Sequence, residues 1–170
     1  MIETFVEGLQ GSSPYLLLLI TVLAFLECMV GIGLFVSGTI LLSTATWLYS
    51  TSAFSPASIV AAAFLGAIVG DHGGYFVGRS AEPLMLNSKF IKKHHTVAAR
   101  ITAGLQRSFL LSICIGRFIP VARSLTPAMA GAAGLSRIRF HVYDSIACII
   151  WSTGLALLMV GLGDFIVDNL

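Results

Sequence analysis

Long apolar segments alternate with short polar ones along the chain, which predicts a protein built from membrane-embedded helices. The apolar segments cover residues 14–50, 56–78, 108–135 and 140–163. The second and fourth segments have the length of one helix that crosses a bilayer, for which about 20 residues are needed. Between them, residues 82–107 mix apolar and charged positions, and this pattern predicts an amphipathic helix at the membrane surface.

Interruptions divide the first and third apolar segments. Small residues interrupt the first one: Gly31, Gly33, Ser37 and Gly38. Pro120 and Pro127 interrupt the third. Charged residues lie inside both, Glu27 in the first and Arg117 and Arg123 in the third. Irregular backbone is tolerated at membrane depth only where protein covers it or where it lines a cavity. We therefore predict that both segments are re-entrant hairpins.

These elements predict an all-α integral membrane protein with a single membrane domain, residues 1–170. Each half consists of a re-entrant hairpin and a transmembrane helix, and the two halves have opposite orientation, so they form an inverted repeat. The amphipathic helix connects the halves on the cytoplasmic side. Interrupted segments in corresponding positions of two halves are typical of the binding site of a transporter.

The composition agrees with a membrane protein and excludes several other classes. Hydrophobic residues make up 56% of the 170 residues and charged residues only 11%, whereas an average soluble domain is about a quarter charged. The net charge of +2 gives no reason to expect nucleic acid as a partner. The three cysteines lie in apolar runs without a CxxC spacing, so we interpret them as small buried hydrophobic residues.

The basic residues are confined to the middle of the chain, because all ten lie between Arg79 and Arg139. The positive-inside rule therefore predicts a cytoplasmic middle loop and both termini outside. Simple spans in place of hairpins would carry Arg117 and Arg123 across the bilayer. The first apolar run has no basic flank or cleavage site before it, so we expect it to remain in the mature protein.

Four glycines recur at every fourth position of segment 56–78: Gly66, Gly70, Gly74 and Gly78. On a helix they form one smooth strip that permits close packing. We expect this strip to seat another helix or hairpin.

Four ionisable residues within the apolar segments are the informative ones, because each costs several kcal/mol there unless it has a partner. They are Glu27, Asp71, Arg117 and Arg123. One interpretation is structural, with each acid pairing with one arginine. The other is an anion site, because an arginine presents a planar fork that suits phosphate oxygens. Glu27 then holds the arginines when the site is empty and takes up a proton when a phosphate displaces it.

The remaining candidates are expected to support this site. Asp71, Tyr75 and Arg79 share one helix face at i, i+4 and i+8, and we expect Asp71 to brace a hairpin arginine. Pro120 lies between the two arginines and breaks the helix there, so that both side chains surround one cavity. A continuous helix would place them on different faces.

Several motifs resemble those of a known family. They are G-D-H-G-G-Y-F-V-G-R over residues 70–79 and G-R-F-I-P-V-A-R over residues 116–123, together with Glu27, Phe140 and Trp151. This pattern is similar to the DedA family, membrane proteins that share the VTT domain, and the similarity covers nearly the whole chain. The resemblance implies two re-entrant hairpins that face each other, and movement of lipids between leaflets that needs proton-motive force.

The resemblance also assigns residues. It implies that Glu27 is the acid of the first hairpin and that Arg117 and Arg123 are the arginine pair of the second. Several family members have a second acid where this chain has Thr39, so Glu27 is left as the proton-coupling residue. Bacterial members are implicated in recycling undecaprenyl phosphate or in flipping phospholipids.

We therefore expect a transporter for a phosphate-headed lipid, located in the bacterial inner membrane and coupled to protons. A non-selective phospholipid scramblase and a membrane-organising protein without transport remain alternatives. The sequence contains neither G-x-S-x-G nor H-E-x-x-H, and residues 136–144 have the wrong spacing for a lipid phosphatase, so we expect no enzyme activity. No cofactor or metal is expected, and the partners are the lipid, protons and a possible homodimer.

Overall fold

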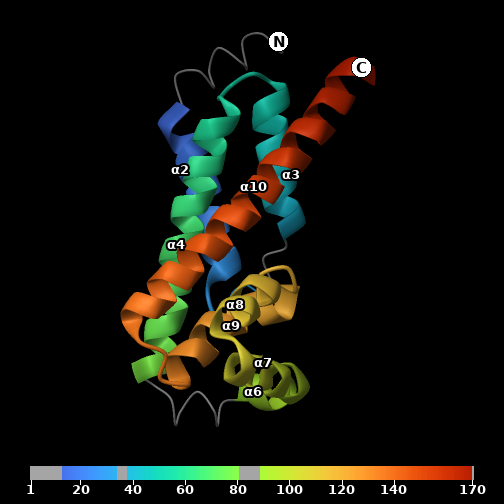
Figure 1. Ribbon diagram of the computed structural model, residues 1–170. Helices are drawn as coiled ribbons and strands as arrows, with labels where there is room; N and C mark the ends of the chain where they lie inside the picture. The colour runs from blue at the N-terminus through green and yellow to red at the C-terminus, as the bar shows by residue number, and fades with distance from the viewer. Residues whose placement is uncertain (1–12, 34–37, 81–88, 170) are drawn as a thin grey trace.

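The computed structural model describes residues 13–33, 38–80 and 89–169, and these residues form helices without a strand among them (Figure 1). The helices are α2 (Ser13–Cys28), α3 (Gly38–Ser50), α4 (Pro56–Ser80), α6 (Lys89–Lys93), α7 (His95–Arg107), α8 (Phe109–Gly116), α9 (Pro120–Ala132) and α10 (Arg137–Asn169). The prediction of an all-helical protein is confirmed for this part of the chain. Ser37 and the beginning of segment 82–107 lie outside the described residues.

Two helices run the length of the molecule and cross each other obliquely (Figure 1). Helices α4 and α10 are long and apolar enough to cross a membrane. At a rise of about 1.5 Å per residue, α10 extends roughly 50 Å, which exceeds the ~30 Å hydrocarbon core of a bilayer. It includes the expected segment 140–163 and extends beyond both of its ends. Such a helix is tilted in the bilayer or extends beyond the hydrocarbon core at its ends.

The other helices form two groups of short helices, one toward each end of α4 (Figure 1). Helices α2 and α3 pack with α4 and α10 around the buried residues Ile20, Leu41, Leu48, Ile59 and Met159. Helices α7, α8 and α9 pack around a second cluster of buried hydrophobic residues. Helices α2, α3, α8 and α9 are each shorter than a bilayer-crossing helix. Their length suits the expected re-entrant hairpins, and the membrane topology of these hairpins stays a prediction.

The turn after α2 explains where that helix ends. Gly31 has a φ of +84°, a left-handed conformation that side chains disfavour. The backbone N–H of Gly33 donates to the carbonyl of Met29 at 2.9 Å and closes the turn. The chain thus leaves α2 directly after Glu27 and Cys28, and this end of α2 lies toward the middle of the molecule (Figure 1).

The glycine strip of α4 seats both groups of short helices, as the sequence predicts. A Cβ atom on Gly66 would meet the carbonyl of Thr21 in α2. At the other end of the strip, a Cβ atom on Gly78 would meet the backbone of Ala128 in α9. Both helices therefore approach α4 as closely as backbone permits, which maximises packing without large side chains.

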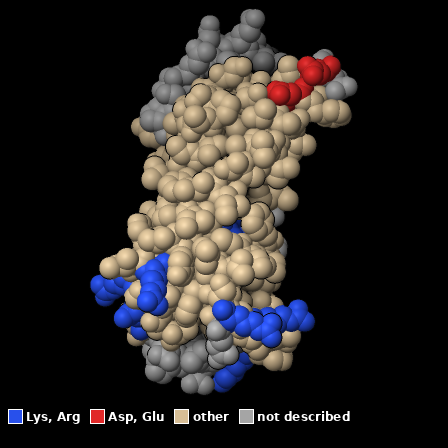
Figure 2. Space-filling model, viewed as in Figure 1, with Lys and Arg blue, Asp and Glu red and all other residues tan. Residues whose placement is uncertain are grey.

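The charged surface divides along the long axis (Figure 2). Lysine and arginine side chains gather at the end that carries α6, α7 and the start of α10, which we call the basic end. Asp164 and Asp168, near the end of α10, lie at the opposite end, and the visible surface between the two ends is almost free of charged side chains. This segregation agrees with the topology predicted from the sequence.

Two local expectations are wrong. Residues 89–107 form two helices, α6 and α7, in place of one, and the apolar face of α7 does not lie free for a membrane surface. Ala98, Ile101 and Leu105 are buried against α8 and α9. The apolar stripe therefore packs on protein.

Pro127 does not interrupt its segment either, because α9 continues through it to Ala132. Pro120 does mark an interruption, because α8 ends at Gly116 and Pro120 begins α9, where its missing N–H needs no partner. Ile119 before it is extended, with a φ of −105° and a ψ of 115°, as a residue preceding proline prefers.

Candidate functional site

The turn between α8 and α9 brings Arg117 and Arg123 together. Arg117 caps the end of α8, and Arg123 lies in the first turn of α9. Both are buried, with 5% and 6% of their surface exposed. The guanidinium carbons lie 5.4 Å and 4.4 Å from the centre of the Trp151 ring of α10, within the range of a cation–π interaction. The indole is therefore a shared platform for both cations.

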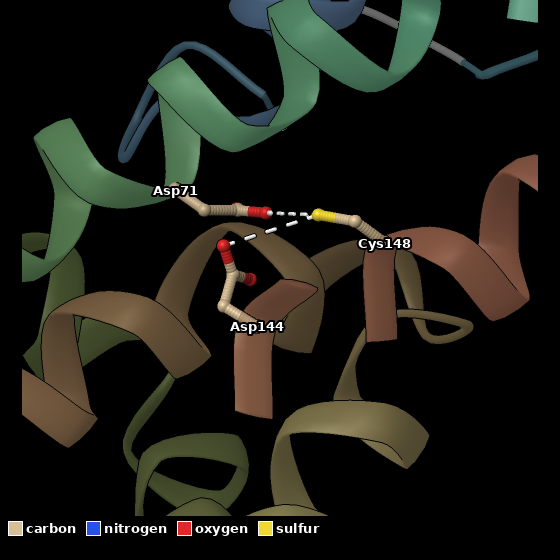
Figure 3. Close-up of side chains that lie close together, drawn as sticks. All are labelled: Asp71, Asp144 and Cys148. Carbon is tan, nitrogen blue, oxygen red and sulfur yellow. Dashed lines mark hydrogen bonds between the residues drawn. The ribbon is translucent and has the colours of Figure 1, made fainter. Parts of the chain in front are cut away.

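Arg117 lies between two aspartates (Figure 3 shows their side chains). Its Nη1 donates to Asp71 of α4 and, at 3.2 Å, to Oδ1 of Asp144 of α10. Both aspartates are fully buried. The thiol of Cys148 lies 3.9 Å from one oxygen of each carboxylate (Figure 3). Arg117 thus links α4 to α10 through charged hydrogen bonds.

Arg123 has a different set of partners. Its Nη1 donates to Oε1 of Glu27, at the end of α2, and its Nη2 lies 3.2 Å from the sulfur of Cys28. Glu27 is also buried. The two ion pairs expected from the sequence therefore form in this arrangement: Glu27 pairs with Arg123, and Asp71 pairs with Arg117.

Asp144 is the residue that the sequence reasoning missed. It lies within the expected span 140–163, and an ionisable residue at that depth was a sufficient signal to include it. The structure places it opposite Asp71 and in contact with Arg117. The sequence also predicts no polar role for Cys28, Cys148 or Trp151, although each contacts a member of the site.

Tyr75 and Arg79 make their hydrogen bonds at a different place from Asp71. The hydroxyl of Tyr75 donates to the carbonyl of Leu135 at 2.6 Å, and Nη1 of Arg79 donates to the same carbonyl at 3.0 Å. The Arg79 guanidinium also donates to the Tyr75 hydroxyl at 2.9 Å. These two side chains hold the connection between α9 and α10. Only Asp71 of the three contacts a hairpin arginine.

The charges of the site do not balance when all groups are ionised. Two guanidinium groups face three carboxylates, namely those of Glu27, Asp71 and Asp144. Several buried polar atoms also have no hydrogen-bond partner within the described part of the chain: Oε2 of Glu27, Oδ1 of Asp71 and the Nε atoms of Arg117 and Arg123. The arginines therefore retain unused donors, and the acids have one excess negative charge.

Asp71, Asp144 and Cys148 are close enough together to suggest a metal site (Figure 3). However, the guanidinium of Arg117 contacts both carboxylates and already supplies a positive charge there. A divalent ion would have to displace it. We therefore assign no metal to this group.

A recess of about 180 Å³ lies beside Glu27. Its lining includes Glu27, Leu41, Phe118, Trp151 and Leu158. Phe118 and Leu158 are 61% and 57% exposed, so the recess reaches the outer surface of the molecule. It is mostly apolar, and its polar end lies at the ion pair of Glu27 and Arg123.

Two long apolar helices with paired charges between them are compatible with a helical membrane protein. The chain belongs to the VTT-domain family, because the model of that family matches residues 13–161. This result confirms the resemblance to DedA proteins.

Several relatives are membrane proteins. An uncharacterised membrane protein of Buchnera aphidicola (strain Bp) is 30% identical over 149 residues, which cover 86% of this chain and 57% of the relative. Inner membrane protein YabI of Escherichia coli K12 is 26% identical over 140 residues, covering 82% of this chain and 55% of the relative. The chain thus spans about half the length of these curated relatives. No solved structure matches it.

Proposed function

We propose that this protein moves a phosphate-headed lipid, such as undecaprenyl phosphate or a phospholipid, between the leaflets of the bacterial inner membrane, with coupling to protons. The observation that carries the proposal is the pair of buried arginines over one indole ring. Two adjacent guanidinium groups with unused Nε donors suit the oxygens of a phosphate.

The headgroup would bind by exchange with Glu27. Glu27 accepts from Nη1 of Arg123, a donor that a phosphate would use. A phosphate that replaces this carboxylate would leave Glu27 without its positive partner in a buried position. Because an unpaired buried charge is costly, Glu27 would then take up a proton. Binding of the headgroup and uptake of one proton are coupled in this scheme.

The apolar chain of the lipid would remain outside the polar site. The recess provides an apolar path from Glu27 and Trp151, which contact the arginines, to the outer surface at Phe118 and Leu158. A headgroup that enters the recess therefore does not need to bring its chains through the protein core. The proposal includes no chemical step on the lipid.

Vesicles that contain the purified protein test this function. The probes are fluorescent analogues of phosphatidic acid, which carries a terminal phosphate, and of phosphatidylcholine, whose phosphate is esterified. Their exposure in the outer leaflet is measured with a membrane-impermeant quencher, in vesicles of phosphatidylcholine and phosphatidylglycerol. We expect the protein to accelerate the movement of phosphatidic acid, and a pH gradient to change this rate.

The control probe separates the alternatives. Equal acceleration of both lipids, independent of the pH gradient, would replace the proposal with a non-selective scramblase. Absence of any acceleration would indicate a membrane-organising protein without transport. Vesicles without protein give the spontaneous rate for each probe.

A further inference from the structure

A pair of histidines connects the surface to the buried acids. His72 follows Asp71 in α4, and its side chain is only 24% exposed. Its Nδ1 lies 2.9 Å from the carbonyl oxygen of Ile68, and its Nε2 lies 3.0 Å from Nδ1 of His141 in α10. His141 is exposed near the start of α10, at the basic end. Neither histidine belongs to the arginine site described above.

The contacts determine which nitrogen carries hydrogen. A carbonyl oxygen can only accept, so Nδ1 of His72 carries the hydrogen and donates to Ile68. When His72 is neutral, its Nε2 is an acceptor, and His141 must donate from Nδ1. The Nε2 of His141 then has its lone pair available for a proton from water. The two rings form a directed chain that begins at the surface.

The inner end of this chain reaches Asp144. Nδ1 of His72 lies 3.6 Å from Oδ2 of Asp144, while Oδ1 of the same carboxylate accepts from Arg117 at 3.2 Å. A small rotation of the imidazole would bring its Nδ1–H to Asp144 in place of Ile68. Charged and titratable groups surround this point on several helices, namely Asp71 on α4, Cys148 on α10, Arg117 at the end of α8, and beyond them Glu27, Cys28 and Arg123.

Charge balance indicates why a proton would be delivered to this carboxylate. Asp71 and Asp144 share one guanidinium, so the group has a net negative charge when both acids are ionised. One proton on Asp144 would neutralise the group. It would also remove one of the two ionic partners of Arg117 and loosen that arginine for a phosphate oxygen.

We propose that His141 and His72 form a proton relay from the basic end to Asp144, an inference that rests on the proposed proton-coupled transport. Nε2 of His141 takes a proton from water, and the Nδ1 proton of His141 passes to Nε2 of His72. The Nδ1 proton of His72 then passes to Oδ2 of Asp144. Each ring gains one proton and loses one, and the net result is one proton moved from water to the carboxylate. Before the next proton, each ring rotates out of the chain and returns to the starting tautomer by losing its Nε2 proton to water and taking one from water on Nδ1, which the exposure of His141 and the partial exposure of His72 permit.

The test uses glutamine in place of each histidine, because glutamine keeps hydrogen bonds but cannot pass a proton along. His72→Gln and His141→Gln are compared with His95→Gln, which changes an exposed histidine of α7 outside the relay. Each protein is placed in vesicles that contain a pH-sensitive dye. Two quantities are measured under an imposed pH gradient: the rate of proton entry, and the rate of flipping of the phosphatidic acid analogue.

We expect His72→Gln to slow proton entry and gradient-driven flipping by about 100-fold, the scale of a positioned acid–base group. His141→Gln should slow both by about tenfold, since water can reach the half-buried His72 directly. Imidazole in the buffer should partly restore His141→Gln. Equilibrium binding of the phosphatidic acid analogue should not change in either variant, because a relay alters only the rate at which protons arrive.

The outcomes separate this inference from the proposed function. If wild-type protein neither flips the probe nor admits protons, the proposed function fails. If wild-type protein does both and His141→Gln equals wild type and His95→Gln, the relay is wrong while the function stands. His141 is exposed, so its replacement leaves the fold intact and this result is decisive even if His72→Gln proves unstable. A loss of probe binding in His141→Gln would also overturn the relay, because it would indicate a binding role.

Discussion

Arg117 and Arg123 lie near each other over one indole ring, yet their surroundings differ in charge and in access. Arg117 contacts two fully buried aspartates on the two long helices. Arg123 contacts a single glutamate on α2, and that glutamate borders the recess. The first arginine has an excess of negative partners, whereas the second is balanced.

This difference suggests a division of roles within one site. The region around Arg117 joins α4 to α10 and can store a proton without losing its ion pair, since a second carboxylate remains. The region around Arg123 has an exchangeable partner beside an opening, which suits entry of a headgroup.

The largest effect is expected from removing the charge of Arg117. Arg117→Met would leave Asp71 and Asp144 facing each other without a cation, and the loss of one partner from a buried ionic group costs about 3–5 kcal/mol. Arg123→Met should cost less, about 1–3 kcal/mol, because it strands a single acid that borders the recess. Thermal unfolding in detergent measures both. Equal destabilisation by the two substitutions would contradict the division of roles.

The next effect concerns the glycine strip that positions both regions. An alanine at Gly70 would push against the carbonyl of Phe25 and the Cβ of Cys28, at 2.7 Å and 2.8 Å from the added Cβ atom, and so displace the end of α2 that carries Glu27. An alanine at Gly78 would push against Ala128 and displace α9 with Arg123. Overpacking of this kind costs about 1–3 kcal/mol.

Gly73 provides the matched control for these two substitutions. It lies on the same helix, and a Cβ atom there meets nothing within 4 Å among the described residues. Gly73→Ala should therefore unfold at the same temperature as wild type, or slightly higher, because alanine favours a helix. If all three alanine variants were equally stable in detergent, the close approach of α2 and α9 to α4 would be wrong.

The sequence allowed much of this framework to be predicted. Uninterrupted apolar segments predict α4 and α10, since a bilayer selects helices of that length. The spacing of Gly66 to Gly78 predicts a seat for close packing, and Glu27, Asp71, Arg117 and Arg123 are conspicuous because charges are rare in such segments. Segment length and glycine spacing are local signals in the sequence. The signal from each charged residue depends on the free-energy cost of burying that one residue.

The missed features depend on contacts between distant segments. The amphipathic pattern of α7 indicates an apolar face, and it does not say whether lipid or protein covers that face. Pro127 has the same local signal as Pro120, yet α9 tolerates it. His72 and His141 are 69 positions apart in the chain, and only the crossing of α4 and α10 brings their rings together. Spacing in the sequence cannot reveal such a pair.

A smaller effect is expected when a substitution keeps the positive charge of Arg123 but removes its planar guanidinium group. Arg123→Lys retains a cation for Glu27, so the midpoint of thermal unfolding should change little. A lysine presents a point charge without the planar fork, which removes one charge-assisted hydrogen bond to a phosphate. Binding of the phosphatidic acid analogue should weaken about tenfold, or about 1.4 kcal/mol. Unchanged binding would place the headgroup elsewhere, and Arg117→Lys provides the parallel measurement for the other region.

The smallest change in structure is Glu27→Gln, which imitates the protonated side chain and keeps an oxygen that accepts from Arg123. Because the headgroup must displace a charged Glu27 in the wild type, binding takes up a proton and tightens as the pH falls, by at most about tenfold per pH unit. Glu27→Gln removes this competition. Binding of the phosphatidic acid analogue should therefore be as tight as in the wild type or tighter, and its pH dependence between about pH 6 and 8 should be mostly lost.

The matched comparison is with the wild type on the same probe, because the titration of the probe itself is common to both proteins and cancels. Proton entry by way of the relay should persist in Glu27→Gln, since the relay from His141 ends at Asp144, beside the other arginine, whereas proton entry coupled to headgroup movement should be lost. His72→Gln should give the opposite result, with normal pH-dependent binding and slow proton entry. If Glu27→Gln keeps the full pH dependence of binding, Glu27 is only a structural partner of Arg123, and the exchange with phosphate proposed for this region is wrong.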